Sequence, residues 1–183
     1  MRRKRLFIWV EGHDDILFFN KIIRPIFRRR YDVVEVRQYA QMKKHKLEKL
    51  LLSLEELQAD CLVVADIDFH PCVTSKKQYL SYRFPSVPPE KFVVVIQEIE
   101  SWYLAGLTAN RSKTLGVAPV RSTNQITKEI FIELKPRNHT KLGFMLEILK
   151  RYSIHTATQR NGSFKYFMNK HLLWSKDDHV TAG

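Results

Sequence analysis

Short apolar runs alternate with amphipathic stretches through the first half of the chain. Continuous apolar runs of strand length occupy residues 6–10, 61–65 and 92–96, and a segment rich in valine spans 32–39. Between the first three of these four segments, apolar residues recur at helical spacing over 16–27 and 47–57. Buried parallel strands are continuously apolar, and strands that alternate with helices favour a parallel sheet. The pattern therefore predicts an α/β fold with a parallel sheet of about four strands flanked by helices.

The second half of the chain is predicted to be helical. Helical spacing runs over residues 102–107, 123–134, 142–152 and 164–173, and no fifth apolar run is as clear as the first four. Four prolines between the third and fourth strands favour a loop or a short helix there. We therefore expect an α/β domain over 1–108, a helical extension over 109–174 packed on the same domain, and a loose tail over 175–183.

Acidic residues follow three of the predicted strands. The carboxyl ends of parallel strands lie along one edge of a sheet, where ligands of open α/β sheets bind. Clustered carboxylates raise one another's pKa, and a divalent cation such as Mg²⁺ relieves that repulsion with oxygen ligands. We therefore predict a Mg²⁺ site, with Mn²⁺ as a possible substitute. Its expected ligands are Glu11, Asp66, Asp68, Glu98 and Glu100.

Two further features bear on these acids. Asp66 and Asp68 are two residues apart, so an extended backbone would direct both carboxylates to one side. Asp14 and Asp15 stand at the start of a predicted helix, where aspartate is a preferred capping residue. We therefore expect the first pair at the metal site and the second pair at the helix cap.

Composition adds a prediction about partners. The chain has 183 residues, of which 44% are hydrophobic, enough for a packed core, and 31 Lys+Arg against 19 Asp+Glu give a net charge of +12. Such a charge favours nucleic acid as a partner, with DNA preferred over RNA, although a solvated basic surface is the alternative. Two cysteines and no membrane-length apolar run favour a cytoplasmic protein. Candidate phosphate-binding residues are Arg37, Lys43, Lys44 and Lys141.

The acidic pattern resembles a known family. An apolar strand ending in Glu11-Gly12-x-x-Asp15, followed by another ending in Asp66-x-Asp68, is similar to the toprim domain of topoisomerases, primases and the overcoming-lysogenization-defect nucleases. The resemblance covers about residues 5–105. The segment 97–105 resembles the Glu-x-Glu-x-Trp-x-Leu run of small bacterial and archaeal toprim-like proteins, and 162–164 resembles their Ser-Phe segment before the last helix. The resemblance to the toprim domain implies a Rossmann-like sheet.

The resemblance also implies roles for the acids. Glu11 would be the general acid/base or a metal ligand, Asp66 and Asp68 would hold Mg²⁺, and Glu98 and Glu100 would complete the site. The implied function is Mg²⁺-dependent hydrolysis of nucleic-acid phosphodiesters, in which Glu11, Asp66 and Asp68 are catalytic. The loop 69–72 lacks the further acid that many members carry, which counts against a second metal ion.

Other interpretations remain open at this point. A non-catalytic module that binds nucleic acid or a protein would carry the same pattern, and phosphoryl chemistry on a nucleotide is a third candidate. A zinc site of Asp66, Asp68, His70 and Cys72 is disfavoured because structural zinc prefers paired Cys or Cys/His ligands. Trp102 and Tyr103 could stack on a base, although packing between helix and sheet is the commoner role.

Overall fold

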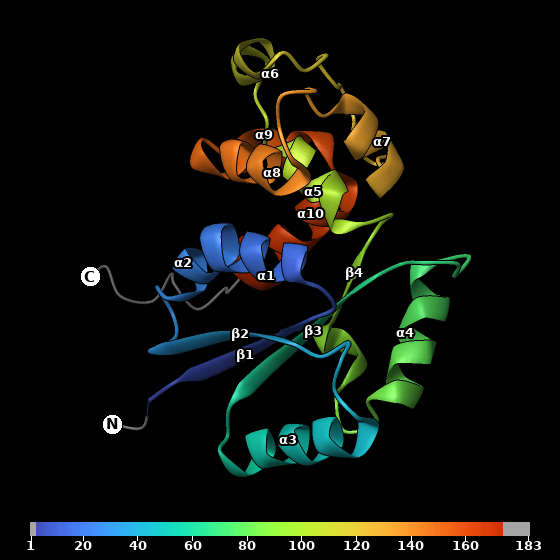
Figure 1. Cartoon of the computed structure of the whole chain (residues 1–183). Helices are drawn as coiled ribbons and strands as arrows, with labels where there is room; N and C mark the ends of the chain where they lie inside the picture. Colours follow the sequence, from blue (N-terminus) through green and yellow to red (C-terminus); the bar gives the residue numbers. More distant parts are fainter. Residues whose placement is uncertain (1–2, 174–183) are drawn as a thin grey trace.

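The protein is built around a parallel four-stranded sheet with strand order β2-β1-β3-β4. We describe residues 3–173 of a computed structural model, without the side chains of Lys44, Glu55 and Leu173. The strands are β1 (Arg5–Val10), β2 (Val33–Gln38), β3 (Asp60–Asp66) and β4 (Phe92–Val95). All three strand pairings are parallel, and Figure 1 shows helices on both sides of the sheet. This confirms the predicted α/β class and its Rossmann-like architecture.

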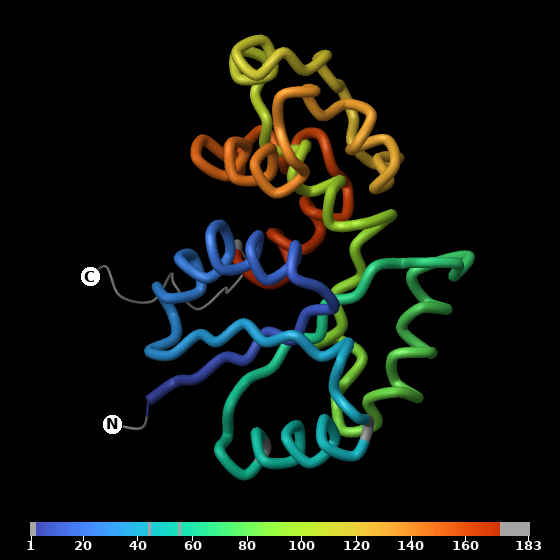
Figure 2. The backbone as a smooth tube through the Cα atoms, in the orientation of Figure 1, coloured from blue at the N-terminus to red at the C-terminus, as the bar shows by residue number. Residues whose placement is uncertain are grey.

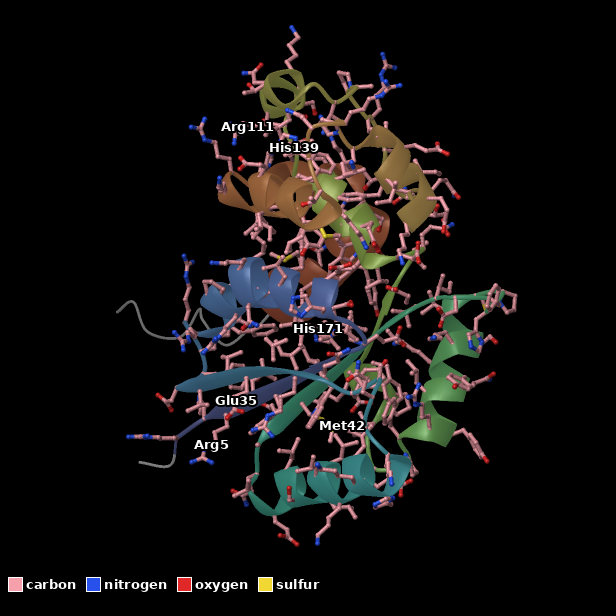
Figure 3. The ribbon with its side chains drawn as sticks, viewed as in Figure 1. Arg5, Glu35, Met42, Arg111, His139 and His171 are labelled. Atoms are coloured by element: carbon pink, nitrogen blue, oxygen red, sulfur yellow. The ribbon has the colours of Figure 1, made fainter. Side chains whose placement is uncertain are left out.

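The side chains of β1 alternate between two hydrophobic cores. Leu6 and Ile8 belong to the larger core, whereas Phe7 and Trp9 belong to the smaller one on the opposite face. Successive side chains of a strand point to opposite faces, so one continuous apolar run supplies both cores. Met42, labelled in Figure 3, packs against the smaller core beside α3 (Lys44–Glu56).

One helical run covers the face of the larger core beside β1. It comprises α1 (His13–Phe18), the π-helical turn η1 (Phe19–Ile23) and α2 (Arg24–Phe27). Pro25 has no backbone N–H and so cannot donate the hydrogen bond that an α-helix needs at its position. The π turn η1 ends at Ile23, two residues before this proline. There the Arg24 N–H donates to the Phe19 carbonyl, five residues back. The proline is therefore accommodated without ending the helical run.

The opposite face is covered by α3 and α4 (Val73–Arg83). The prolines around α4 favoured a loop or a short helix, yet α4 has 11 residues. Pro71 lies before the helix, and Pro85 follows its end, so neither interrupts it. A short 3₁₀ turn, η2 (Pro89–Lys91), leads into β4.

The second half of the described chain is helical, and Figure 2 shows it stacked beyond α1 and α2. Two helices, α6 and α9, fall outside the predicted segments. The predicted start at residue 123 is wrong, because Thr127 is the N-cap of α7 and accepts a hydrogen bond from the Ile130 N–H. The elements are α5 (Ile99–Ala105), α6 (Ala109–Leu115), α7 (Lys128–Leu134), α8 (Lys141–Lys150), α9 (Ile154–Arg160), α10 (Gly162–Met168) and η3 (Asn169–Leu173).

The helical half and the sheet share the larger core. Phe131, Phe144 and Phe164 from the helical half belong to the same cluster as Leu6 and Val64 from the strands. No helix among residues 3–173 is long and apolar enough to cross a membrane. The tail predicted over 175–183 lies outside the described residues.

Candidate functional site

An acidic pocket of about 390 Å³ lies at the carboxyl ends of the strands. The strand order reverses between β1 and β3, because β1 is followed along the chain by β2 on one side and later by β3 on the other. Ligands of open α/β sheets bind at such a switch point. The residues that line the pocket are Glu11, Gly12, His13, Asp14, Asp15, Gln38, Ala40, Gln41, Asp66, Glu98, Ile99, Glu100, Lys128 and Lys141.

Asp66 is the last residue of β3, and its carboxylate differs from the others of the pocket in its burial and hydrogen bonding. Its Oδ1 atom is buried and has no hydrogen-bond partner among the described residues. Burial raises the pKa of Asp66 well above its usual value, and the charges of neighbouring acids, led by Asp15 and Glu11, raise it further. An unpartnered buried carboxylate oxygen is costly unless a proton or a cation reaches it.

Glu11 directly follows β1 and is held by Tyr39 from the neighbouring strand end. The Tyr39 hydroxyl donates to Glu11 Oε1 at 2.9 Å and also contacts the Val64 carbonyl at 3.2 Å. Burial raises the pKa of Glu11, whereas the Tyr39 hydrogen bond lowers it. Tyr39 itself is fully buried, with its ring edge-on to Phe84 at a centroid distance of 5.3 Å. Glu11 therefore has one carboxylate oxygen fixed in position.

Asp15 belongs to the pocket, a role that the sequence reasoning missed. The expected cap is present: the Gly12 N–H donates to Asp15 Oδ2 at 3.0 Å. However, Asp15 is only 6% exposed, and burial raises its pKa to about 7, with added repulsion from Glu11 and Glu100. Its place in the Glu-Gly-x-x-Asp pattern was the signal that could have identified it. Asp15 is therefore both a helix cap and a pocket acid.

Glu98 and Glu100 both reach the pocket, as their positions after β4 predicted. Glu98 accepts a hydrogen bond from the Lys128 backbone N–H. Glu100 is 4% exposed and pairs with the Lys141 ammonium at 2.6 Å. The pocket thus collects carboxylates from the ends of three strands.

Lys141 lies inside the acidic pocket rather than on an open basic surface. Its ammonium also contacts Asp14 Oδ2 at 2.6 Å, so one lysine of α8 links α1 and α5. Burial lowers the pKa of Lys141, but the hydrogen bonds to Asp14 and Glu100 outweigh it and leave the pKa raised. Lys141 is therefore a built-in positive charge that neutralises part of the acidic cluster.

Asp68 is separated from Asp66. Its backbone has a φ of 50°, so the extended geometry ends with β3 and the argument from period-two spacing does not hold. The Asp68 carboxylate instead pairs with Lys76 of α4, whose side chain is 2% exposed. Asp68 does not line the pocket, although its charge still raises the pKa of Glu11. Lys76 had no sequence signal, because only the fold brings α4 to this strand end.

Two other candidate phosphate-binding residues, Arg37 and Lys43, lie outside the pocket lining. Arg37 of β2 pairs with Glu35, and its guanidinium lies 5.1 Å from the Phe7 ring centre. Lys43 is exposed in the loop before α3, and Lys44 begins that helix. The structure therefore gathers neither Arg37 nor Lys43 around the acids, and the side chain of Lys44 is not among those described.

The aromatic residues beside Glu100 have a structural role. Trp102 and Tyr103 are both 0% exposed, which excludes base stacking in this arrangement. The Trp102 indole N–H donates to Ser163 Oγ at 2.8 Å, and Ser163 Oγ bonds with Asn161 Oδ1 at 2.8 Å. The Trp and Ser of the sequence pattern thus join α5 to α10.

The pocket suits a hard cation in its chemistry, though it contains no complete ligand cage. Carboxylate oxygens are the ligands that Mg²⁺ prefers, and no described side chain or backbone group bonds to Asp66 Oδ1. Within residues 3–173, no three His, Cys, Asp or Glu side chains come together as a ready metal site, including the disfavoured zinc set. Mg²⁺ is usually held by one or two carboxylates together with waters and substrate phosphates. The residues therefore fit an ion held mainly by Asp66 and one neighbour, Glu11 or Asp15.

No protein-family model matches the chain, and no curated protein or solved structure is significantly similar to it. The function is therefore inferred from the pocket and from the sequence pattern at the strand ends.

Proposed function

We propose that the protein hydrolyses phosphodiester bonds of nucleic acid with the help of Mg²⁺ or Mn²⁺ bound in the acidic pocket, as a toprim-like nuclease. One observation carries the proposal: Asp66 Oδ1, which has no hydrogen-bond partner within residues 3–173, lies among the acids at the ends of β1, β3 and β4. A cluster of this kind in a chain of net charge +12 is best explained by a cation that it binds. We also propose that the protein acts in the cytoplasm, the location expected from its composition.

The chain's own residues would divide the work. Asp66, with Glu11 or Asp15, would hold the metal ion, which when bound neutralises phosphate charge and orients the attacking water. Glu11 Oε1 is occupied by the Tyr39 hydroxyl, so Oε2 is the atom at which Glu11 can take up a proton. The raised pKa of Glu11 makes it a better base than a solvated glutamate. Tyr39 keeps Glu11 in place.

Positive charge near the acids supports a phosphate substrate. The Lys141 ammonium already lies in the pocket, and Lys128 is a second lysine among the lining residues, with its backbone N–H bonded to Glu98. A substrate phosphate in the pocket could form an ion pair with Lys141 in place of Asp14 or Glu100. The same phosphate would also be a ligand of the Mg²⁺ or Mn²⁺ ion. Phe69, one residue after Asp68, is fully exposed and is available to stack on a base.

The direct test is cleavage of labelled single-stranded and duplex DNA and RNA in Mg²⁺, Mn²⁺ or EDTA. We expect cleavage that needs the divalent ion and falls about a hundredfold or more in Asp66→Asn and in Glu11→Gln. Glu35→Gln is the matched control, because Glu35 is an acid on β2 away from the pocket lining (Figure 3). Full activity in both pocket variants would overturn the assignment.

A second candidate function is non-catalytic binding of nucleic acid, and Lys141 favours it. The Lys141 ammonium already bridges Asp14 and Glu100, so it neutralises part of the acidic cluster without a metal ion. Binding would then depend on surface charge and fall steeply with salt. Affinity for DNA that is the same in EDTA and in Mg²⁺, and unchanged in Asp66→Asn, would select this function if no cleavage occurs.

A further inference from the structure

A second pocket, of about 250 Å³, lies against the outer edge of β4. β4 pairs with β3 and stands at the end of the strand order, so its other side faces the space between α4 and α10. Val73 of α4 and Phe167 of α10 contribute opposite walls, and Val93, Val94 and Ile96 line the floor. This edge pocket shares no lining residue with the acidic pocket.

The lining of the edge pocket is mainly apolar. Val93, Val94 and Phe167 are buried hydrophobic residues, and the polar Ser163 is fully engaged. Its hydroxyl accepts from the Trp102 indole and bonds with Asn161. A ligand body that needs hydrogen bonds would find few partners here, whereas a hydrocarbon body would gain from leaving water.

One lysine lines the edge pocket and a second lies beside it. Lys77 of α4 belongs to the lining. Lys170, which follows α10, is outside the lining but lies 5.7 Å from the ring centre of the lining residue Tyr166, and it donates to the Glu90 carbonyl at 2.8 Å. Among the described residues neither lysine forms an ion pair with a carboxylate, whereas nearby Lys91 pairs with Asp60. Partial burial lowers the pKa of Lys77, and the charge of Lys170 lowers it further. An anion at this rim would relieve the repulsion.

The other titratable group in the edge pocket is neutral. His171, labelled in Figure 3, lines the pocket and packs on the Phe167 ring with centroids 5.5 Å apart. Burial lowers its pKa to about 4, and the charges of the lysines around it add to this effect. At neutral pH the positive charge nearest a ligand is therefore that of Lys77 and Lys170, and the Glu90 carboxylate, which forms no ion pair with either among the described residues, offsets part of it.

We propose that the edge pocket binds a small amphiphilic anion, a medium-chain hydrocarbon body that ends in a carboxylate. The body would lie against Val93, Val94 and Phe167, and the carboxylate would accept hydrogen bonds from Lys77 and Lys170. A neutral apolar ligand would leave the two ammonium groups with only the more distant charge of Glu90 to offset them. A small inorganic anion would leave the apolar walls in contact with water.

The test compares three probes by calorimetry on the full chain: octanoate, octan-1-ol and acetate. We expect saturable octanoate binding, with octan-1-ol and acetate at least tenfold weaker. Amide NMR shifts caused by octanoate should centre on residues 92–96 and 162–171. Equal affinity for octanoate and octan-1-ol, non-saturable binding, or shifts centred elsewhere would overturn the proposal.

Matched variants locate the anion. Lys77→Met keeps the apolar stem and removes the charge, so octanoate affinity should fall about tenfold while octan-1-ol affinity stays the same. Lys165→Met is the control, because Lys165 is an exposed lysine of α10 outside the pocket lining. An equal loss in both lysine variants, or no loss in Lys77→Met, would contradict the assigned carboxylate position. None of these measurements depends on nuclease activity.

Discussion

The acids near the strand ends differ in whether a lysine neutralises their charge, and this difference determines their roles. Asp68 pairs with the buried ammonium of Lys76, and Glu100 pairs with the partly exposed ammonium of Lys141. Asp66 Oδ1 has no hydrogen-bond partner among the described residues. Of these three carboxylates, Asp66 gains most from a bound cation and loses most stability when it is charged without one.

Asp66→Asn should separate metal binding from stability. Without metal at pH 8, the variant should be more stable than the wild type, with a free energy of unfolding about 1–2 kcal/mol higher, because a neutral amide replaces a buried charge. Its affinity for Mg²⁺ should fall at least tenfold. Urea unfolding in EDTA and Mg²⁺ calorimetry measure the two effects, with Glu35→Gln as the control. Wild-type Mg²⁺ affinity in Asp66→Asn would exclude Asp66 as a ligand.

Tyr39→Phe should change the titration of Glu11. The Tyr39 hydrogen bond lowers the pKa of Glu11, so its loss should raise that pKa and move the acid limb of the pH–activity profile to higher pH. The lost hydrogen bond should cost about 1 kcal/mol of stability, since the ring packing on Phe84 is kept. Carboxyl NMR titration of Glu11 measures the shift directly. A lowered or unchanged Glu11 pKa would show that Tyr39 does not hold the carboxylate in solution.

The elements that the sequence predicts well are those whose apolar pattern is local. The four strands coincide with three short apolar runs and one valine-rich segment, and their observed ends differ from the predicted ends by no more than one residue. For α4 the sequence predicted only a loop or a short helix, because the segment is largely polar: Leu80 and Lys76 are its buried residues. α6 and α9 have only seven residues each, too few for a clear helical period. These short or polar helices are stabilised by tertiary contacts, and the spacing of their apolar residues does not reveal them in the sequence.

The acidic pocket was predictable where topology alone sufficed. Glu11, Asp66 and Glu98 follow parallel strands, and parallel strands bring their carboxyl ends together. The separation of Asp68 was not predictable, because it depends on one left-handed residue and on the approach of Lys76. Pairing between distant helices has no local signature in the sequence.

The junction of α5 with the chain beyond it depends on the absence of a side chain at Gly106. A Cβ atom built there would lie 2.2–2.5 Å from ring atoms of Tyr152, whose hydroxyl donates to the Trp102 carbonyl at 2.8 Å. Gly106→Ala should therefore displace Tyr152 and cost about 2–4 kcal/mol. Gly162→Ala is the control, because its Cβ would meet its nearest neighbour at 3.6 Å. Thermal unfolding of both variants checks the prediction, and equal stabilities would contradict it.

The stability of the whole molecule should depend on pH through the acidic pocket. The pKa of Asp15 is raised to about 7 and that of Asp66 is also raised, so the folded state binds more protons than the unfolded state between about pH 4 and 7. Stability from these groups is present at low pH and is lost as the pH rises through the folded pKa. In EDTA, we expect the free energy of unfolding to fall by roughly 2 kcal/mol from pH 5 to pH 8.

Millimolar Mg²⁺ should restore much of that loss at pH 8 and have little effect at pH 5, where protons occupy the carboxylates. Urea unfolding at the two pH values, with and without Mg²⁺, provides the measurement. Stability in EDTA that rises from pH 5 to pH 8 would show that these acids are not buried together.

The core that the sheet shares with the helical half has a consequence for entry into the acidic pocket. Asp14, Glu100 and Lys141 come from three helices that all pack into this core, so the side of the pocket that they form has a fixed width. Ala40 and Gln41, exposed residues of the connection from β2 to α3, also line the pocket and belong to neither hydrophobic core. The packing that fixes the three helices therefore does not extend to this part of the pocket wall.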